Sequence, residues 1–573
     1  MSKTIISERF KSILLASTFS MGILEVLPLA AVIIAGNMLG EEAIAAISLT
    51  APITRMLEFI GELMAAGTLA LIGYESGRGE INTVNKLYSQ EIFLAITFGV
   101  IFTAGLFLFR ESILSYWDVS PNLMNYANEY YIGIIISPTF EFLSIFLSSL
   151  VLLQGEEHLA AISAGVQLVA GIALQILFCK FFGILGLGLA TSASVILVVL
   201  ICGSYLFKKD CPLKFNFYLS FKKLREIFRL SFCVATPELF MALLPIVVNT
   251  YLLINFNENA ITIFAVLNSL TGLAIAMFYG LDDILQSMVC VYLGEKNLVC
   301  VKKVMNLCVK SALLEGALIM AVLLVFADFI PALFGIDESN LYEPATEAVR
   351  IYAVFLSSIF FTMTYAFYYM YIERKLLSAF LQSLLLFLLP LGCIYLLGNI
   401  FGLNGVWLGL GLGLLMEFPV NILIVNFIDK KSHGKLIGLL MLEQDILSHQ
   451  VSYDIVTTKE KVLELVYKLK DDLAAWNLSE RKLHLLELFI EEIGMHAVER
   501  AQRDNEIFHI EFTITNGEQI ELISRDNGEL VDVTNSNETP SSFGMYVVSQ
   551  LAEHMPFRSY IVIGGENRTV IKI

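Results

Sequence analysis

The chain has 573 residues, of which 57% are hydrophobic and 16% are charged, and its formal net charge is −17. This composition excludes a water-soluble enzyme, because soluble domains are about 45–50% apolar and about 25% charged. The acidic balance argues against nucleic acid as a partner, since phosphate binding needs clustered cations. Residues 441–573 hold 12 basic and 23 acidic side chains, so the apolar excess lies in the first 440 residues. We therefore expect a polytopic membrane protein with a soluble, acidic tail.

Apolar stretches long enough to cross a bilayer recur along the first 430 residues. A membrane helix needs about 20 mainly apolar residues, and the pattern predicts an all-α membrane domain of twelve such helices. The expected spans are 11–36, 44–73, 88–109, 126–152, 160–182, 184–207, 228–254, 260–291, 306–330, 347–372, 377–399 and 403–428.

Basic residues gather at the N-terminus and in the loops after even-numbered spans, as Lys3, Lys86 and Lys223 illustrate. Cytoplasmic loops of membrane proteins carry an excess of Lys and Arg. Because the number of spans is even, we expect both termini to be cytoplasmic. We expect a multi-pass protein of the plasma membrane, most simply a bacterial inner membrane.

An internal repeat divides the membrane domain into two six-helix lobes. Six spans per lobe give a parallel repeat about an axis along the membrane normal, which is a transporter architecture. We expect lobes at 1–207 and 228–435, joined by a basic linker at 208–227, with a second linker at 436–454. The repeated anchors are Pro28 with Pro245 and Gly77 with Gly294, each 217 residues apart, and Gly183 with Gly402, 219 residues apart.

Ionisable side chains inside the spans are candidate coupling sites, because an intramembrane charge is costly and by default functional. Glu25 and Glu238 each lie close to a proline (Pro28 and Pro237) that removes a backbone donor from the helix. Each could instead be a protonated residue hydrogen-bonded to a neighbouring helix, and Glu58 could belong to a local ion-pair cluster. Asp282 and Asp283 are adjacent, and adjacent residues point about 100° apart on a helix. We therefore expect at most one of these two aspartates to face a cavity. The candidates are Glu25, Glu58, Glu238, Asp282 and Asp283, with Glu62, Glu141, Glu315 and Glu417 as weaker ones.

The first lobe contains the stretches GNMLGEEAIAAISLTAPI and ESGRGEINTVNKLYSQ, and the second lobe contains LDDILQSMVCVYLGEKNLVCVKKV. These three stretches resemble multidrug and toxic compound extrusion (MATE) transporters. The resemblance covers about residues 10–430. It implies antiport of an organic, cationic or amphipathic substrate against H⁺ or Na⁺. Many members carry an aspartate where this chain has Ala31, so that cation ligand does not carry over. A flippase for a lipid-linked substrate and a receptor-like sensor that signals through the tail are the alternatives.

The periodicity of the tail changes from about residue 455. Two amphipathic helices are followed by a hairpin with its turn at Asn516-Gly517, a further helix and a final hairpin. This order predicts an α/β sandwich over residues 455–573. It resembles the ATPase domain of the gyrase and histidine-kinase superfamily, especially its anti-sigma-factor serine-kinase branch.

The resemblance assigns nucleotide-binding roles to Glu492, His496, Asp526, Gly528 and Gly544. It implies ATP or ADP, with or without magnesium, and an aspartate, Asp526, that reads the adenine amino group. His496 stands where the family has a magnesium-binding asparagine, and magnesium prefers oxygen ligands. We therefore expect neither ATPase nor kinase activity. A regulatory role is expected instead, through a cytoplasmic protein partner or self-association of the tail.

Overall fold

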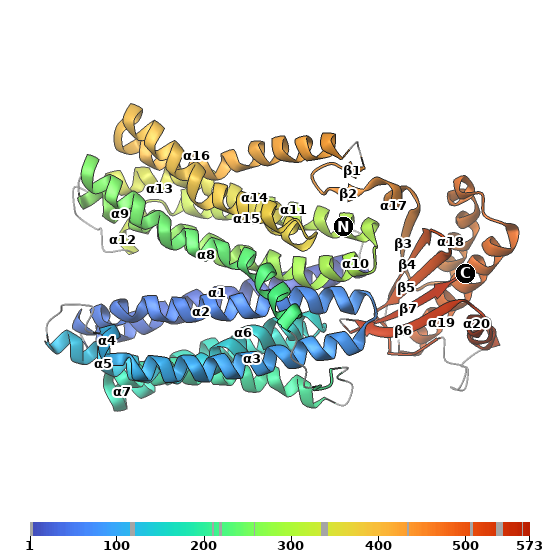
Figure 1. The fold of residues 1–573 in the computed structure, drawn as a ribbon, viewed down its shortest axis with the longest axis horizontal. Helices are drawn as coiled ribbons and strands as arrows, with labels where there is room; N and C mark the ends of the chain where they lie inside the picture. The colour runs from blue at the N-terminus through green and yellow to red at the C-terminus, as the bar shows by residue number, and fades with distance from the viewer. Residues whose placement is uncertain are drawn as a thin grey trace.

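A computed structural model describes residues 4–573 apart from 40, 115–120, 209–210, 212, 217–220, 257, 334–341, 433–434, 505–507, 534–542 and 564. The first lobe consists of helices α1 to α7 and the short helix η1, and the second lobe consists of α8 to α16 (Figure 1). In the first lobe the bounds are α1 Ile5–Leu39, α2 Glu41–Gly77, α3 Ile81–Leu108, α4 Arg110–Leu114, α5 Pro121–Ile134, α6 Pro138–Leu153, α7 Glu157–Gly203 and η1 Ser204–Phe207.

The second lobe repeats this arrangement with two π-helical turns, η2 and η3, inserted in its helices. The bounds are α8 Phe221–Asn255, α9 Glu258–Ile284, η2 Leu285–Val289, α10 Cys290–Gly294, α11 Leu298–Val325, α12 Phe329–Leu333, α13 Tyr342–Leu356, α14 Ser358–Tyr371, α15 Lys375–Ser383, η3 Leu384–Leu388 and α16 Leu389–Lys431.

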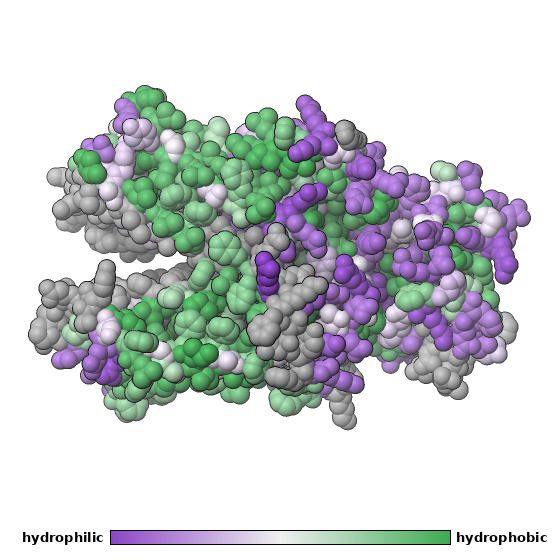
Figure 2. Space-filling model, in the orientation of Figure 1, coloured by the Kyte–Doolittle hydropathy of each residue, from purple (hydrophilic) through white to green (hydrophobic). Residues whose placement is uncertain are grey.

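Within the described residues, seven helical segments are long and apolar enough to cross a membrane, or eight if the bent pair α5 and α6 forms one span. Figure 2 shows apolar surface over both lobes and hydrophilic surface over the tail and the adjoining end of the bundle. The two longest segments, α7 and α16, are each interrupted by a glycine with non-helical backbone angles. The chain is therefore a membrane-embedded helical protein with a polar domain at one end of the bundle.

The two lobes share left-handed backbone positions at the spacing of the sequence repeat. Gly183 has φ 62° and ψ −142°, and Gly402 has φ 64° and ψ −142°. Both breaks fall where the sequence predicts the boundary between two spans. The turn residues Gly79 and Gly155 of the first lobe also have positive φ, as do Lys296 and Glu373 at the corresponding places of the second lobe. A residue that carries a side chain rarely adopts a positive φ. The positive φ at Lys296 and Glu373 therefore indicates that the geometry of these turns is repeated in the second lobe.

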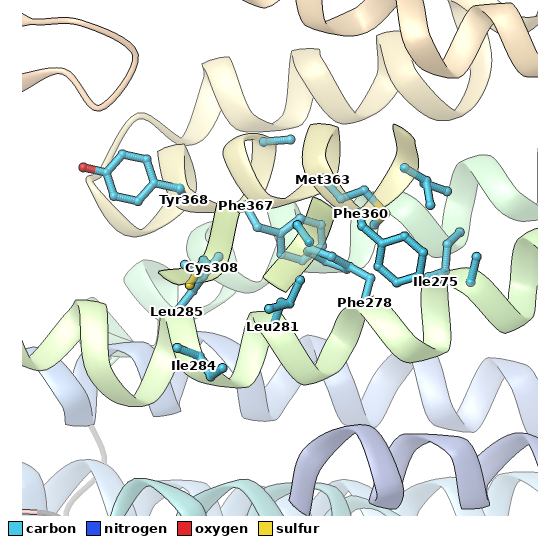
Figure 3. Packing of buried hydrophobic residues seen from close by; sticks show 14 of the residues in the cluster. Ile275, Phe278, Leu281, Ile284, Leu285, Cys308, Phe360, Met363, Phe367 and Tyr368 are labelled. Carbon is cyan, nitrogen blue, oxygen red and sulfur yellow. The ribbon is translucent and has the colours of Figure 1, made fainter. Parts of the chain in front are cut away.

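The core of the second lobe lies between α9, α11 and α14 (Figure 3). Phe278 of α9 and Phe367 of α14 meet edge to face, with ring centroids 5.1 Å apart. Cys308 of α11 packs in the same cluster and is fully buried. This apolar packing makes the lobe a rigid unit.

The tail contains a five-stranded antiparallel sheet in the order β3-β4-β5-β7-β6. Helices α18, α19 and α20 pack on the face of the sheet that points away from the membrane lobes (Figure 1). The tail elements are β1 Leu436–Ile437, β2 Leu442–Glu443, α17 Gln444–Ser448, β3 Gln450–Val456, α18 Lys459–Asp472, η4 Ala474–Trp476, α19 Glu480–Asp504, β4 His509–Asn516, β5 Ile520–Asp526, α20 Phe543–Glu553, β6 Phe557–Ile563 and β7 Glu566–Lys572.

The start of the tail domain differs from the sequence-based expectation. The segment 436–454 was expected to be a linker, but β3 begins at Gln450 and forms the edge of the sheet next to β4. Its polar Gln450, Ser452 and Asp454 alternate with an apolar stripe, Val451, Tyr453 and Ile455, that packs against the tail core, so the period-two pattern was present in the sequence but overlooked. The strand is stabilised by pairing and by contacts with the second lobe, neither of which a local sequence window reveals.

Candidate functional site

The two lobes meet at the end of the bundle next to the tail, which we call the tail end, through the glycine pair that the repeat predicts. A Cβ atom on Gly77 would lie 2.2 Å from the carbonyl oxygen of Val291 and 3.1 Å from the Cα of Gly294. A Cβ atom on Gly294 would lie 2.3 Å from the carbonyl oxygen of Tyr74. Such distances leave no room for a side chain, so the ends of α2 and α10 touch backbone to backbone.

Further contacts join the lobes along α2. The Tyr74 hydroxyl donates to the carbonyl of Tyr371 at 2.6 Å, and the backbone N–H of Gly67 donates to Ser231 Oγ at 3.0 Å. These bonds connect α2 of the first lobe to α14 and α8 of the second. The tail end of the bundle is therefore closed by specific contacts, whereas the lobes spread apart toward the opposite end (Figures 1 and 2).

Asp282 and Asp283 lie at the end of α9 beside this contact, and both are buried. Asp282 accepts hydrogen bonds from the Tyr371 hydroxyl at 2.8 Å and from Gln286 Nε2 at 3.2 Å. Asp283 lies beside Ser17 of α1, and its Oδ2 has no hydrogen-bond partner in the described part of the chain. The two carboxylates therefore point to different lobes, and only Asp283 reaches the boundary between α1 and α9.

The other coupling candidates are distributed over separate helices. Glu58 is half-buried in α2 and lies near Glu141 of α6. Glu25 and Glu238 occupy helical backbone in α1 and α8, but their side chains lie outside the described part of the structure. The described residues thus bring Asp282 and Asp283 together, and they place Glu58 in a different part of the bundle.

Two further buried carboxylates stand out, one absent from the sequence candidates and one ranked low among them. Glu91 of α3 is buried and accepts a hydrogen bond from Thr68 Oγ1 at 2.7 Å. It lies inside the expected span 88–109, so the rule that ionisable residues within spans are candidates would have included it. Glu417 of α16 is completely buried, and neither of its carboxylate oxygens has a hydrogen-bond partner among the described residues.

In the tail, Asp526 at the end of β5 already accepts hydrogen bonds from three protein donors. Its carboxylate accepts from Arg500 Nη2 at 3.1 Å, from the Gly528 N–H at 3.0 Å and from Asn567 Nδ2 at 2.9 Å. Arg500 is buried and also donates to the carbonyl of Glu529. The Arg500 guanidinium therefore competes for one of the oxygens that the adenine-reading role implied by the resemblance would use.

Of the other predicted nucleotide-binding residues, His496 and Glu492 lie on the same helix as Arg500, whereas Gly544 lies in α20. His496 lies one helical turn before Arg500 on α19 and is buried, and desolvation together with the Arg500 charge lowers its pKa to about 4. Glu492, one turn earlier, is half-buried. Gly544 lies in the first turn of α20, and the segment 534–542 before it is outside the described residues. A neutral histidine beside an arginine offers no oxygen ligand for magnesium.

Two repeat-related helical lobes, apolar on the outside and with buried carboxylates where they meet, define a polytopic membrane protein of transporter architecture. The MatE family profile matches residues 16–177 and 237–396, one segment in each lobe. The chain belongs to the MatE family. The comparison with curated proteins found no match.

Solved structures with the same fold cover the membrane domain. "Crystal structure of MATE in the bent conformation" matches with a TM-score of 0.67 and 20% identity, covering 74% of this chain and 96% of the other. An "outward-facing conformation of a multidrug resistance MATE family transporter of the MOP superfamily" gives the same four values. A MOP superfamily transporter from Pyrococcus furiosus Vc1 matches with a TM-score of 0.68 and 20% identity, covering 74% and 95%. At this identity the likeness concerns the fold.

Proposed function

We propose that the chain is a MATE-like secondary active efflux transporter that exchanges an organic, cationic or amphipathic substrate for H⁺ or Na⁺. The observation that carries the proposal is the position of Asp283. This carboxylate is buried between α1 of one lobe and α9 of the other, and one of its oxygens is unpartnered among the described residues. A carboxylate at a boundary that opens and closes changes its solvation in each cycle.

This change of solvation supplies a coupling mechanism. A buried, incompletely paired carboxylate must be protonated or must bind a cation, because an isolated charge in a low dielectric costs several kcal/mol. When the lobes separate, water reaches the group and the ion leaves. Asp282 retains the Tyr371 and Gln286 donors inside the second lobe, so it serves as a weaker candidate for the same exchange. Glu25 and Glu238 remain proposed coupling residues.

We infer that twelve spans cross a bacterial plasma membrane and that both termini lie in the cytoplasm. The backbone breaks at Gly183 and Gly402 support the division of α7 and α16 into two spans each. The tail then faces the cytoplasm, and we propose that it regulates transport. ATP or ADP is the ligand that the resemblance implies, but the Arg500 guanidinium on Asp526 argues for a tail that acts without nucleotide.

The test is a flux assay with purified protein in proteoliposomes, using ethidium as the cationic probe and applying sodium and pH gradients separately. We expect ethidium flux under one gradient. Glu25→Gln, Glu238→Gln and Asp283→Asn should each reduce it at least tenfold, because the amide cannot release a proton and carries no negative charge to balance a bound cation. Glu464→Gln, on the exposed surface of α18, is the matched control and should transport normally.

Binding of ethidium without flux under either gradient would favour the receptor-like alternative. Movement of a lipid-linked probe in place of ethidium would favour a flippase. Unchanged flux in all three carboxylate variants would assign these residues a structural role.

A further inference from the structure

The face of the tail sheet opposite its helices is polar, yet it is buried. Glu511 and Thr513 of β4, Arg525 of β5, and Glu566 and Arg568 of β7 are each at most 5% exposed. Charged residues are almost never fully buried unless they are paired. This face is therefore a built interface, and its partners are the tail ends of both lobes.

On the side of the second lobe, the interface is formed by the turn between α10 and α11. Glu295 in this turn is buried and forms ion pairs with Arg525 and with Arg568, whose Nε lies 2.6 Å from Glu295 Oε1. The guanidinium of Arg525 also lies over the ring of Tyr292, 4.8 Å from its centroid. Both arginines of the sheet thus converge on a single carboxylate of the second lobe.

The edge strand β3 adds hydrogen bonds to the same turn. Gln450 Nε2 donates to the Lys296 carbonyl at 3.1 Å, while its Oε1 accepts from the Val299 N–H at 3.2 Å. Lys303 Nζ donates to Ser452 Oγ at 2.9 Å. Because the chain also enters the tail directly from α16, the tail is anchored to the second lobe.

On the side of the first lobe, the central contact is Arg9 of α1. Its Nη1 lies 3.3 Å from Glu566 Oε2, and its Nη2 donates to the carbonyl of Leu153 at 3.4 Å. The same oxygen of Glu566 lies 3.2 Å from Arg525 Nη1. The charges therefore form one continuous buried chain that runs from the first lobe through the tail to the second lobe. Its members, in order, are Arg9, Glu566, Arg525, Glu295 and Arg568.

This chain is complete only while the lobes touch at the tail end. Alternating access requires the two halves to rock against each other, and opening the Gly77–Gly294 contact would carry Arg9 away from Glu295. Glu566 would then lose one of its two cationic partners. Removing one member of a buried ion pair is strongly destabilising, because the remaining charge stays desolvated.

We propose that the tail is a clamp that bridges the two lobes and holds the transporter closed at the tail end until the contact with the first lobe is released. The proposal rests on the proposed transport function, since a clamp matters only to a protein whose lobes move. It assigns the regulatory role of the tail to a specific contact, Arg9 with Glu566, which no nucleotide is needed to form.

The first test uses the full-length protein with Arg9→Gln, and with Glu464→Gln as a surface control. Hydrogen exchange is measured at the ends of α2 and α10, where the lobes touch. We expect at least tenfold faster exchange in Arg9→Gln, equivalent to about 1.4 kcal/mol, and no change in the control. Faster exchange in β6 and β7 alone, with the α2 and α10 ends still protected, would mean that the tail detaches while the lobes stay closed, and it would refute the clamp.

The second test fixes the contact covalently and does not depend on removing a buried charge. Ile81 of α3 and Val562 of β6 line the same small cavity between the first lobe and the tail. Ile81→Cys with Val562→Cys, joined by a short bis-maleimide, should stop ethidium flux, whereas the two single variants treated alike should retain it. Full flux in the cross-linked protein would overturn the proposal. If neither wild type nor Arg9→Gln shows flux but Arg9→Gln opens the α2 and α10 ends, the clamp stands and the proposed transport function fails.

Discussion

A methyl group added at the contact between the lobes should drive the tail end open. In Gly77→Ala, the new Cβ would lie 2.2 Å from the Val291 carbonyl oxygen, so the helices must move apart by on the order of 1 Å to reach ordinary van der Waals distance. Overpacking of this kind costs about 1–3 kcal/mol. The population closed at the tail end should fall about 5- to 150-fold. Gly294→Ala should act in the same way, because its Cβ would meet the Tyr74 carbonyl at 2.3 Å.

The matched control is Gly105→Ala in α3, where nothing lies within 4 Å of the added Cβ. It gains the same helix propensity, about 1 kcal/mol, without the clash. The distance between spin labels reports the opening, with the labels attached at Glu80→Cys and Leu376→Cys, two exposed positions on different lobes, in a background without reactive native cysteines. We expect a longer-distance population in Gly77→Ala and a wild-type distribution in Gly105→Ala. Identical distributions in the two variants would refute the assignment of Gly77 to a closed contact.

The remaining predictions concern the carboxylates, the tail and the topology. Asp282→Asn should reduce ethidium flux less than Asp283→Asn does, because Asp282 accepts from Tyr371 and Gln286 inside the second lobe, whereas Asp283 lies at the boundary between the lobes; equal losses would show that the two positions act as one site. Arg500→Ala should free an oxygen of Asp526 and increase binding of ADP to the full-length protein in calorimetry, whereas wild type should show little binding, and strong wild-type binding would show that the Arg500–Asp526 contact does not prevent it. Because the pKa of His496 is lowered to about 4, folding keeps this residue neutral, so stability is lost as pH falls from about 6.5 toward 4, by about 3 kcal/mol in total. Hydrogen exchange of α19, corrected for its intrinsic pH dependence, should show this loss in wild type but not in His496→Asn. Protease added outside intact cells should leave residues 441–573 whole, and cleavage there would reverse the proposed orientation.

The sequence predicted the membrane lobes well because lipid makes strong local demands. A span must be long, apolar and helical, so its boundaries can be read from a window of about 20 residues. The residues with positive φ in α7 and α16, Gly183 and Gly402, fall at the two span boundaries that the sequence predicts. The tail helices and most of its strands also follow from local periodicity, because one face of each packs on a shared apolar core.

The sequence alone determined that this chain has two repeated helical lobes and a polar tail, because hydropathy, repeat spacing and periodicity are local properties. It also singled out Gly77 and Gly294 as equivalent positions, but only the tertiary structure brought them into contact with each other. In the same way, the alternation of β4 and β5 reports that one sheet face is polar, and a polar face looks the same in sequence whether it meets water or a partner. The three-dimensional arrangement decided that Arg525 and Glu566 are buried between the tail sheet and the ends of the two lobes, and that Arg500 forms an ion pair with Asp526. The ion pairs of Glu566 with Arg9 and of Arg525 with Glu295 join residues hundreds of positions apart, and the Arg500–Asp526 pair depends on the direction of one side chain. No local sequence pattern encodes such contacts.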